Sequence, residues 1–178
     1  MDDTERTLII LKPDTIKRGI VGNIITRFER AGLKIVAMKM IAPDELHFRK
    51  HYEDIGNLIS RWGEDIYNIT LAHMMSAPVI AFVLEGTDSV AYVRKLVGTT
   101  DPMESAPGTI RGDYTHITRS TTNAMGTTMP NILHASATTD EANQEISLWF
   151  KDDEIYGDYD TAQGPVVRGH VPNKNRPS

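Results

Sequence analysis

Residues 6–12 read "RTLIILK", a short apolar run that stops at a Lys-Pro pair. A run of this length is typical of a buried β-strand, and the proline marks its end because the residue before a proline avoids the helical region. Two more apolar runs follow: "LKIVAMKMI" at 33–41 alternates in part, and "PVIAFVLEG" at 78–86 is strongly apolar. These three runs predict three strands of one sheet.

Helical spacing fills the intervals between the strands. Apolar residues at 20, 24, 25 and 28 predict a helix that stops at Gly32. Those at 90, 93 and 97 predict a second helix, with Asp88 as its cap and Gly98 at its end. A short helix begins near 43–45, and 53–76 predicts one or two helices with a break near Gly63.

The remaining sequence predicts one more strand, one more helix and two loops. "DYTHIT" at 113–118 predicts a fourth, weaker strand between a long loop at 99–112 and a surface loop at 119–130. Thr138 and Glu141 form a capping-box pattern ahead of a last amphipathic helix, whose Trp149 and Phe150 we expect in the core.

This order of elements predicts an α+β fold. Strands and helices alternate as in a ferredoxin-like βαββαβ arrangement, a four-stranded antiparallel sheet with the helices packed on one face. A helical hairpin within 53–77 and a C-terminal tail would be additions to that plan. We expect residues 1–150 to form the domain. Residues 151–178 are rich in Gly, Pro, Asp and Asn and predict an extended or disordered extension, or one that packs on a neighbouring subunit.

Composition excludes several functional classes. The net charge of −5 and the pI near 5.6 oppose binding to nucleic acid or to anionic lipid, and an RNA-binding ferredoxin-like domain would need a basic, aromatic sheet face. The chain has no cysteine, so disulfides and cysteine zinc sites are excluded. No signal sequence and no apolar run of membrane length is evident, so we expect a cytoplasmic protein with no membrane contact.

The polar residues that stand out are dispersed along the chain. Lys12 ends the first strand, Arg94 lies near a helix end, and Arg111 closes the 99–112 loop. Strand ends and loops of such a sheet can converge on one cleft. Three cations there, with the neutral donors Thr100 and Asn131, would suit a polyphosphate, because charge-assisted hydrogen bonds hold the anion.

The histidines are ambiguous from spacing alone. His134, in "MPNILHASAT" at 129–138, has polar neighbours, yet most histidines in soluble proteins only pack. His47 and His51 are four residues apart and could share a helix face, but no third ligand accompanies them. We therefore predict no protein-held metal, and we expect His73 and His116 to be structural.

Several stretches together resemble the nucleoside diphosphate kinase family. "ERTLIILKPD", "KRGIVGNIITRFERAGLKIVAMK", "HYEDI", "APVIAFVLEG", "VRKLVGTTDP", "APGTIRGDY", "NILHAS" and "EISLWF" follow in the family's order. The resemblance covers about residues 5–150, and "PGTIRGD" together with the "N-x-x-H-A-S" pattern is its most specific part.

The resemblance implies a ping-pong phosphotransferase. His134 would take the γ-phosphate of a nucleoside triphosphate, mainly ATP, and pass it to a nucleoside diphosphate. A neutral imidazole suits this role because it carries a lone pair at physiological pH. Lys12 would contact the transferring phosphoryl group with Tyr52 nearby. The residues implied for the other phosphates and the sugar are Arg94, Thr100, Arg111 and Asn131.

The resemblance also implies a support for the histidine, a cofactor and an assembly. Glu145 would hold the second ring nitrogen of His134 with help from Ser136. Mg²⁺ would arrive with the nucleotide, bridging phosphate oxygens, so no protein ligand to it is expected. The chain would form a homo-oligomer, either a hexamer or a tetramer.

The chain departs from the family in a few places. Thr15 and Ala135 stand where glycines are usual, and Ala137 replaces an aspartate. Insertions lie within 53–77 and at about 119–130. The first falls where the family stacks the nucleobase on an aromatic residue, and the candidates for that contact are Trp62, Leu58 and Tyr67.

A second hypothesis is a catalytically lapsed nucleotide-binding or regulatory module on the same fold, because a fold does not imply an activity. Such a module tends to lose the catalytic histidine, lysine or arginine first. All three kinds of residue are present here, so the sequence favours the enzyme.

Overall fold

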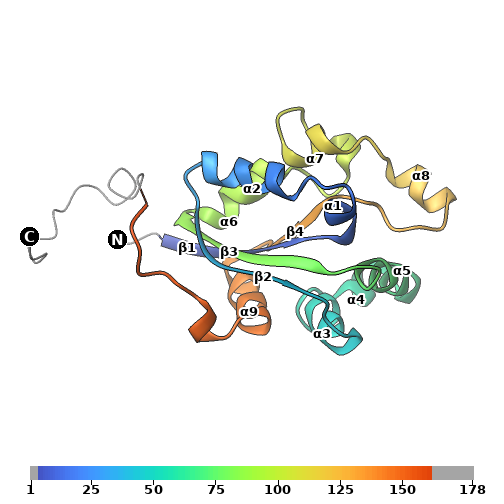
Figure 1. Ribbon diagram of the computed structural model, residues 1–178. Helices are drawn as coiled ribbons and strands as arrows, with labels where there is room; N and C mark the ends of the chain where they lie inside the picture. Colours follow the sequence, from blue (N-terminus) through green and yellow to red (C-terminus); the bar gives the residue numbers. More distant parts are fainter. Residues whose placement is uncertain (1–3, 162–178) are drawn as a thin grey trace, which may run out of the picture.

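The computed structural model describes residues 4–161, which form one four-stranded antiparallel sheet with helices on both faces (Figure 1). The strands are β1 (Thr4–Leu11), β2 (Lys34–Ile41), β3 (Val79–Thr87) and β4 (Leu133–Ala135). Their order across the sheet is β2-β3-β1-β4. The α+β fold and the first three strands are therefore as predicted.

The fourth strand was predicted at the wrong place. Residues 113–118 form no strand; instead α7 (Ile110–Tyr114) occupies part of them. The side chain of Thr109 accepts a hydrogen bond from the Gly112 N–H and so caps this helix. The strand partner of β1 is β4, whose Leu133 and Ala135 are buried and whose His134 lies opposite Ile10.

The helices that follow β1 and β2 are α1 (Pro13–Lys17), α2 (Val21–Arg30), α3 (Glu45–Arg49), a π-helical turn η1 (Lys50–Ile55), α4 (Leu58–Trp62) and α5 (Glu64–Met74). The predicted break near Gly63 is confirmed, because α4 and α5 meet there at a glycine with φ of 88°. Only glycine adopts that conformation without strain.

The later helices are α6 (Ser89–Val97), the 3₁₀ turn η2 (Pro102–Glu104), α7, α8 (Arg119–Ala124), α9 (Thr139–Trp149) and the 3₁₀ turn η3 (Asp152–Glu154). The 119–130 segment, predicted as a surface loop, thus contains a helix. No helix within residues 4–161 is both long and apolar enough to cross a membrane.

Both faces of the sheet are covered, so the expectation of helices on one face is wrong (Figure 1). Leu8 and Ile10 of β1 point into a core that α3, α5 and α9 complete, and Ile9 and Leu11 point into a second core that α2 and α6 complete. Successive residues of a strand point to opposite faces. A strand buried on both faces therefore needs an uninterrupted apolar run, which residues 8–11 supply.

Two predicted helix caps differ in detail from the pattern. Asp88 occupies the N-cap position of α6, but its φ of 48° accompanies no side-chain cap bond. Glu5 from β1 accepts from the Val90 N–H at 3.2 Å instead. At α9, Thr138 accepts from the Glu141 N–H at 3.1 Å as predicted, while the Glu141 carboxylate accepts from the N–H of Ala137.

The first part of the C-terminal extension packs on the domain itself. The backbone N–H of Tyr156 donates to the carbonyl of Val36 at 2.7 Å, and the Tyr159 hydroxyl donates to the carbonyl of Ile35. Both carbonyls belong to β2, an edge strand of the sheet. The rest of the predicted extension, 162–178, lies outside the described residues.

Candidate active site

A cavity of about 470 Å³ lies beside the C-terminal end of β1 and opens at the surface. Lys12, which directly follows β1, and residues from η1, α4, α5, α8, β4 and α9 line it. Six of the predicted site residues are among them: Lys12, Tyr52, Thr100, Asn131, His134 and Glu145. The structure therefore brings together side chains that are up to 133 positions apart in the sequence, from Lys12 to Glu145.

His134 contacts a buried carboxylate. Its Nε2 lies 2.7 Å from Oε1 of Glu145, at an angle oblique to an ideal hydrogen bond. The other oxygen of Glu145 accepts from the Ser136 hydroxyl at 2.6 Å, and that hydroxyl accepts in turn from the N–H of Leu8 at 3.1 Å. Strand β1 thus positions Ser136, Ser136 positions Glu145, and Glu145 faces His134.

The Glu145 carboxylate remains charged although α9 buries it. Burial is the largest influence and disfavours the anion, but His134, His51 and Ser136 together outweigh it and lower the pKa of Glu145 to about 2. A permanent negative charge against one nitrogen of an imidazole favours the tautomer that carries its proton there.

His51 also lines this cavity and was missed as a site residue. Its side chain is 1% exposed, and its ring lies 4.6 Å from that of His134, nearly perpendicular to it. The indole N–H of Trp149 donates to Nδ1 of His51 at 3.3 Å. Burial, with help from His134, lowers the pKa of His51 to about 3, so this imidazole is neutral.

The sequence carried one usable signal for His51. It directly precedes Tyr52 in the "HYEDI" stretch. The structure adds that both residues lie in the π-helical turn η1, a kind of turn found often at functional sites. His47, four residues before His51, packs its ring 4.5 Å from that of Trp149 and does not line the cavity.

His51, His134 and Glu145 are close enough to share a cation, with ligand atoms within 4.8 Å of one another. Two of these ligand atoms are already in contact with other groups, however. Nδ1 of His51 accepts from Trp149, and Nε2 of His134 contacts Glu145. Both contacts would compete with the binding of a cation at this point.

Lys12 and Asn131 form one wall of the cavity. The ammonium of Lys12 donates to the side-chain oxygen of Asn131 at 2.6 Å, and the amide nitrogen of Asn131 donates to the carbonyl of Thr100 at 3.0 Å. Burial and then the charge of Arg111 lower the pKa of Lys12 to about 8, against a smaller opposite effect of Asp14. Lys12 is therefore a cation at neutral pH, and it loses its charge as the pH rises through about 8.

Arg111 lies behind this wall and does not line the cavity. Its guanidinium donates to four backbone carbonyls, those of Asn131 at 3.0 Å, Gly98 at 3.1 Å, Thr99 at 3.0 Å and Leu133 at 2.7 Å. A guanidinium has five N–H donors, so one remains for a ligand. The arginine fastens the loop after α6 to the strand that carries His134.

Arg94 is an exposed residue of α6 outside the cavity lining. It lies near enough to Arg111 to contribute, after burial, to lowering the pKa of Arg111 to about 10. The two arginines therefore form a local positive field behind Thr100 and Asn131. This field favours an anion in the cavity.

The residue two positions before His134 is strained. Ile132 has φ of 75°, a left-handed conformation that is rare for a β-branched residue. The backbone N–H of Lys12 donates to the carbonyl of Ile132 at 3.0 Å, and the Thr15 hydroxyl donates to the same oxygen. Thr15, which departs from the family's glycine, thus has a clear structural use.

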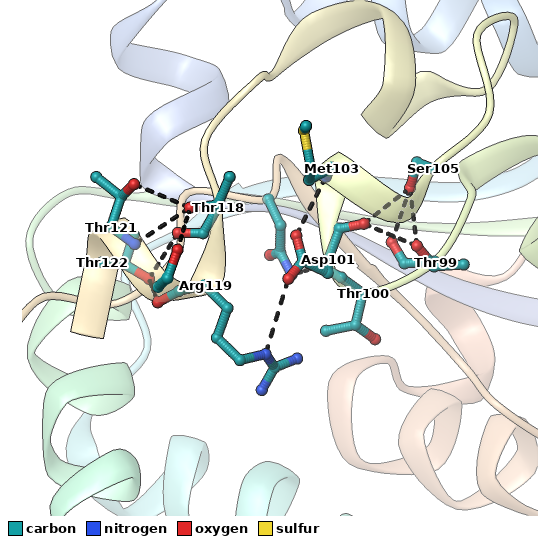
Figure 2. A network of polar contacts seen from close by, with 11 residues as sticks. Thr99, Thr100, Asp101, Met103, Ser105, Thr118, Arg119, Thr121 and Thr122 are labelled. Atoms are coloured by element: carbon teal, nitrogen blue, oxygen red, sulfur yellow. Dashed lines mark hydrogen bonds and ion pairs between the residues drawn. The ribbon is translucent and has the colours of Figure 1, made fainter. Parts of the chain in front are cut away.

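The three residues considered for stacking on a nucleobase differ in whether they line the cavity. Tyr67 points from α5 into the core, is 6% exposed and does not line the cavity, so it is wrong as a candidate for stacking on the base. Trp62 and Leu58 both line the cavity. The 119–130 insertion contributes Arg119, Thr122 and further residues to the same wall, and Figure 2 shows how closely its first turn is bonded.

Fold and cavity together define a nucleotide phosphotransferase. The family model described as "Nucleoside diphosphate kinase" matches residues 5–155. A relative from Borreliella burgdorferi, named nucleoside diphosphate kinase, is 43% identical over 151 residues, 85% of this chain and 90% of the relative. One of the same name from Pyrococcus furiosus is 45% identical over 156 residues, 88% of this chain and 89% of the relative.

Solved structures agree with the sequence matches. The Borrelia burgdorferi enzyme, described as a transition-state mimic with bound vanadate and ADP, superposes with a TM-score of 0.88 at 40% identity, covering 93% of this chain and 97% of that one. An NDP kinase from Pyrobaculum aerophilum gives a TM-score of 0.77 at 35% identity, over 86% of this chain and 99% of that one. This chain belongs to the nucleoside diphosphate kinase family and is a phosphotransferase that acts on nucleotides.

Proposed function

We propose that this enzyme works by a ping-pong mechanism with His134 as the phosphate carrier. The observation that carries the proposal is the contact of Nε2 with Glu145, which leaves Nδ1 as the free nitrogen. The Nδ1 lone pair attacks the γ-phosphorus of a nucleoside triphosphate, the bond to the β–γ bridging oxygen breaks, and a nucleoside diphosphate leaves. A second diphosphate then attacks the phosphohistidine and regenerates the imidazole.

Glu145 supports this reaction electrostatically. As Nδ1 forms its bond to phosphorus, positive charge develops on the ring, and the proton stays on Nε2. A carboxylate 2.7 Å away stabilises that charge without taking the proton. Ser136 acts through Glu145, and His51 packs against the His134 ring as a neutral wall that does not compete as a cation for the carboxylate.

The donors of the cavity hold the phosphates. The ammonium of Lys12 and the amide of Asn131 face the transferring group. The hydroxyl of Tyr52 is buried and has no hydrogen-bond partner among the described residues. Burial raises the pKa of Tyr52, so it stays a neutral donor. Thr100, Arg94 and the free N–H of Arg111 serve the remaining phosphate oxygens.

Mg²⁺ fits this site as an ion that arrives on the nucleotide. Cations and neutral donors face the phosphates, and the buried carboxylate, Glu145, is engaged with His134. The residues present therefore bind phosphate oxygens rather than a free cation. When bound between phosphate oxygens, the ion neutralises part of their charge.

We also propose a cytoplasmic homo-oligomer, either a hexamer or a tetramer. The exposed Met38 and Met40 on the edge strand β2 support an interface there, together with the C-terminal extension that begins along the same strand. Light scattering coupled to size exclusion distinguishes the two assemblies by mass, and a monomer would contradict the proposal.

Labelling tests the role of His134. Incubation with [γ-³²P]ATP should leave acid-labile phosphate on the wild-type protein and none on His134→Ala. His116→Ala is the matched control, because His116 is exposed and lies outside the cavity. Equal labelling of His134→Ala would disprove the assignment. Initial rates at several concentrations of both substrates should give parallel double-reciprocal lines.

A further inference from the structure

His73 lies one helical turn beyond the part of α5 that lines the cavity. Three residues of α5 are cavity residues: Ile66, Ile69 and Thr70. His73 follows Thr70 by three positions, so the two side chains share a face of the helix. His73 itself is not among the residues that line the cavity. Its ring nitrogen Nε2 lies 3.2 Å from a carboxylate oxygen of Asp14, in α1.

The imidazole is the donor of this hydrogen bond. Burial disfavours the charged form of Asp14. The bond from His73, the charge of Lys12 and a backbone N–H together outweigh burial, so the pKa of Asp14 lies below its ordinary value. A charged carboxylate carries no proton and can only accept. His73 therefore has a proton on Nε2 and donates to Asp14.

The other oxygen of Asp14 holds a peptide group close to His134. It accepts from the backbone N–H of Ile132 at 3.1 Å. The carbonyl of Ile132 accepts from the N–H of Lys12 at 3.0 Å and from the hydroxyl of Thr15. Because Ile132 has φ of 75°, its left-handed conformation depends on bonds such as these. The start of β4, and with it His134, is therefore positioned in part by Asp14.

A second contact joins the same two helices. The ammonium of Lys17, the last residue of α1, donates at 2.9 Å to the hydroxyl of Ser76, just beyond the end of α5. This contact is exposed, so water competes with it. The bond from His73 is partly buried and leads, through Asp14, to the strand that carries His134.

We propose that His73 is a positioning residue for phosphoryl transfer, because its bond to Asp14 couples α5 to the peptide that places His134. The inference rests on the proposed function for the role of His134 as phosphate carrier. A nucleotide that contacts Ile69 or Thr70 restrains α5, and His73 passes this restraint to Asp14. Since His73 does not touch the nucleotide, its loss should slow the transfer and leave the affinity for nucleotide unchanged.

Rapid-quench labelling with [γ-³²P]ATP tests the effect on the transfer. His73→Phe keeps an aromatic ring and removes the donor. The rate constant of phosphohistidine formation should fall about tenfold, and the final labelled fraction should equal that of the wild type. The dissociation constant for ADP should change less than about twofold. A merely structural role would lower the labelled fraction, because fewer molecules are folded, and leave the rate constant unchanged. That result would overturn the proposal.

Two further variants separate the hydrogen bond from the shape of the side chain. His73→Gln supplies an amide N–H near the position of Nε2 and should restore the rate constant to within about twofold of the wild type. His116→Phe makes the same exchange of side chain at an exposed histidine outside the cavity and should react as the wild type does. Equal slowing by His73→Gln and His73→Phe, or equal slowing by His116→Phe, would overturn the proposal.

A double-variant cycle tests whether the effect passes through Asp14. In a chain that carries Asp14→Ala, His73→Phe should slow the transfer less than about twofold, because the carboxylate that it positions is gone. Slowing by the full factor in both backgrounds would mean that His73 acts by a route that avoids Asp14, and the proposal would be wrong.

Amide hydrogen exchange at Ile132, followed by NMR, requires no phosphorylation. His73→Phe should speed this exchange at least about threefold, because the acceptor of the N–H is held less firmly. An unchanged exchange rate would overturn the proposal. The proposed function fails separately: a wild-type protein that ATP does not label would disprove the phosphohistidine, while the exchange rate would still decide whether His73 holds Asp14 against Ile132.

Discussion

The backbone N–H of Ile132 donates to a carboxylate oxygen of Asp14 at 3.1 Å, across 118 positions of the sequence. The second oxygen of Asp14 lies 3.2 Å from the ring nitrogen Nε2 of His73. Asp14 follows the proline that ends β1, and Ile132 begins the turn into β4. One carboxylate therefore ties the lysine-bearing end of β1 to the strand that presents His134.

We expect Asp14→Ala to destabilise the protein and to slow catalysis. The buried N–H of Ile132 would lose its acceptor at a residue that is already strained, at a cost of about 2 kcal/mol in the free energy of unfolding. Urea denaturation measures this cost, and labelling by ATP measures the effect on His134. Asp44→Ala, which removes an exposed cap of α3, should lower stability by about 1 kcal/mol and leave labelling unchanged. Unaltered labelling in Asp14→Ala would contradict the link to His134.

Loss of the Glu145 charge should slow phosphohistidine formation more than loss of the Ser136 hydroxyl that supports it. Glu145→Gln keeps the shape but removes the charge, so we expect phosphohistidine formation to slow by roughly a hundredfold. Ser136→Ala removes one hydrogen bond to that carboxylate and should slow the step by roughly tenfold. Rapid-quench measurement of the labelled protein distinguishes the two. Ser147→Ala, on the exposed side of the same helix, is the control and should behave as wild type.

The fall in activity at alkaline pH should be caused by deprotonation of Lys12. Its pKa is lowered to about 8, chiefly by burial, so the ammonium is present below that pH and is lost as the pH rises through it. We therefore expect kcat/KM, which reports the free enzyme, to fall above about pH 8. Lys12→Arg keeps its charge at every accessible pH and should lose this limb, with a lower maximum because the longer side chain disturbs Asn131. A limb that persists unchanged in Lys12→Arg would assign it to another group.

His51 should act through packing and one hydrogen bond. His51→Phe keeps the ring but leaves the buried indole N–H of Trp149 without an acceptor, which should cost about 1–3 kcal/mol of stability. Trp149→Phe in the same chain removes that donor and should recover part of the loss. We expect the double variant to remain slower in phosphohistidine formation than Trp149→Phe alone, because the edge of a neutral imidazole no longer lies against His134. If the two rates were equal, His51 would be a core residue only.

Local pattern was enough for much of the architecture. The apolar runs at 6–12, 33–41 and 78–86 and the helical spacing between them encode their own conformation, because a strand or helix depends mainly on the periodicity of its own residues. The break at Gly63 was visible for the same reason, since a glycine with positive φ is a local property. Short motifs such as "NILHAS" indicated the family, and with it the residues that belong around one site.

Other features were decided only when distant segments met. Strand β4 is only three residues long and forms because it pairs with β1. Residues 113–118 form no strand, because the capped helix α7 includes the first of them. Glu5 of β1 accepts a hydrogen bond at the start of α6, far along the chain. Arg111 donates four hydrogen bonds to carbonyls of two separate segments. Tyr67 is buried in the core, whereas Trp62 is exposed at the cavity. Hydrogen bonds between remote residues, and the burial of a side chain, depend on how the elements pack. The periodicity of a local stretch of sequence carries no information on that packing. The sequence by itself determined which elements and which reactive side chains this protein has; the tertiary structure decided which of them face the cavity.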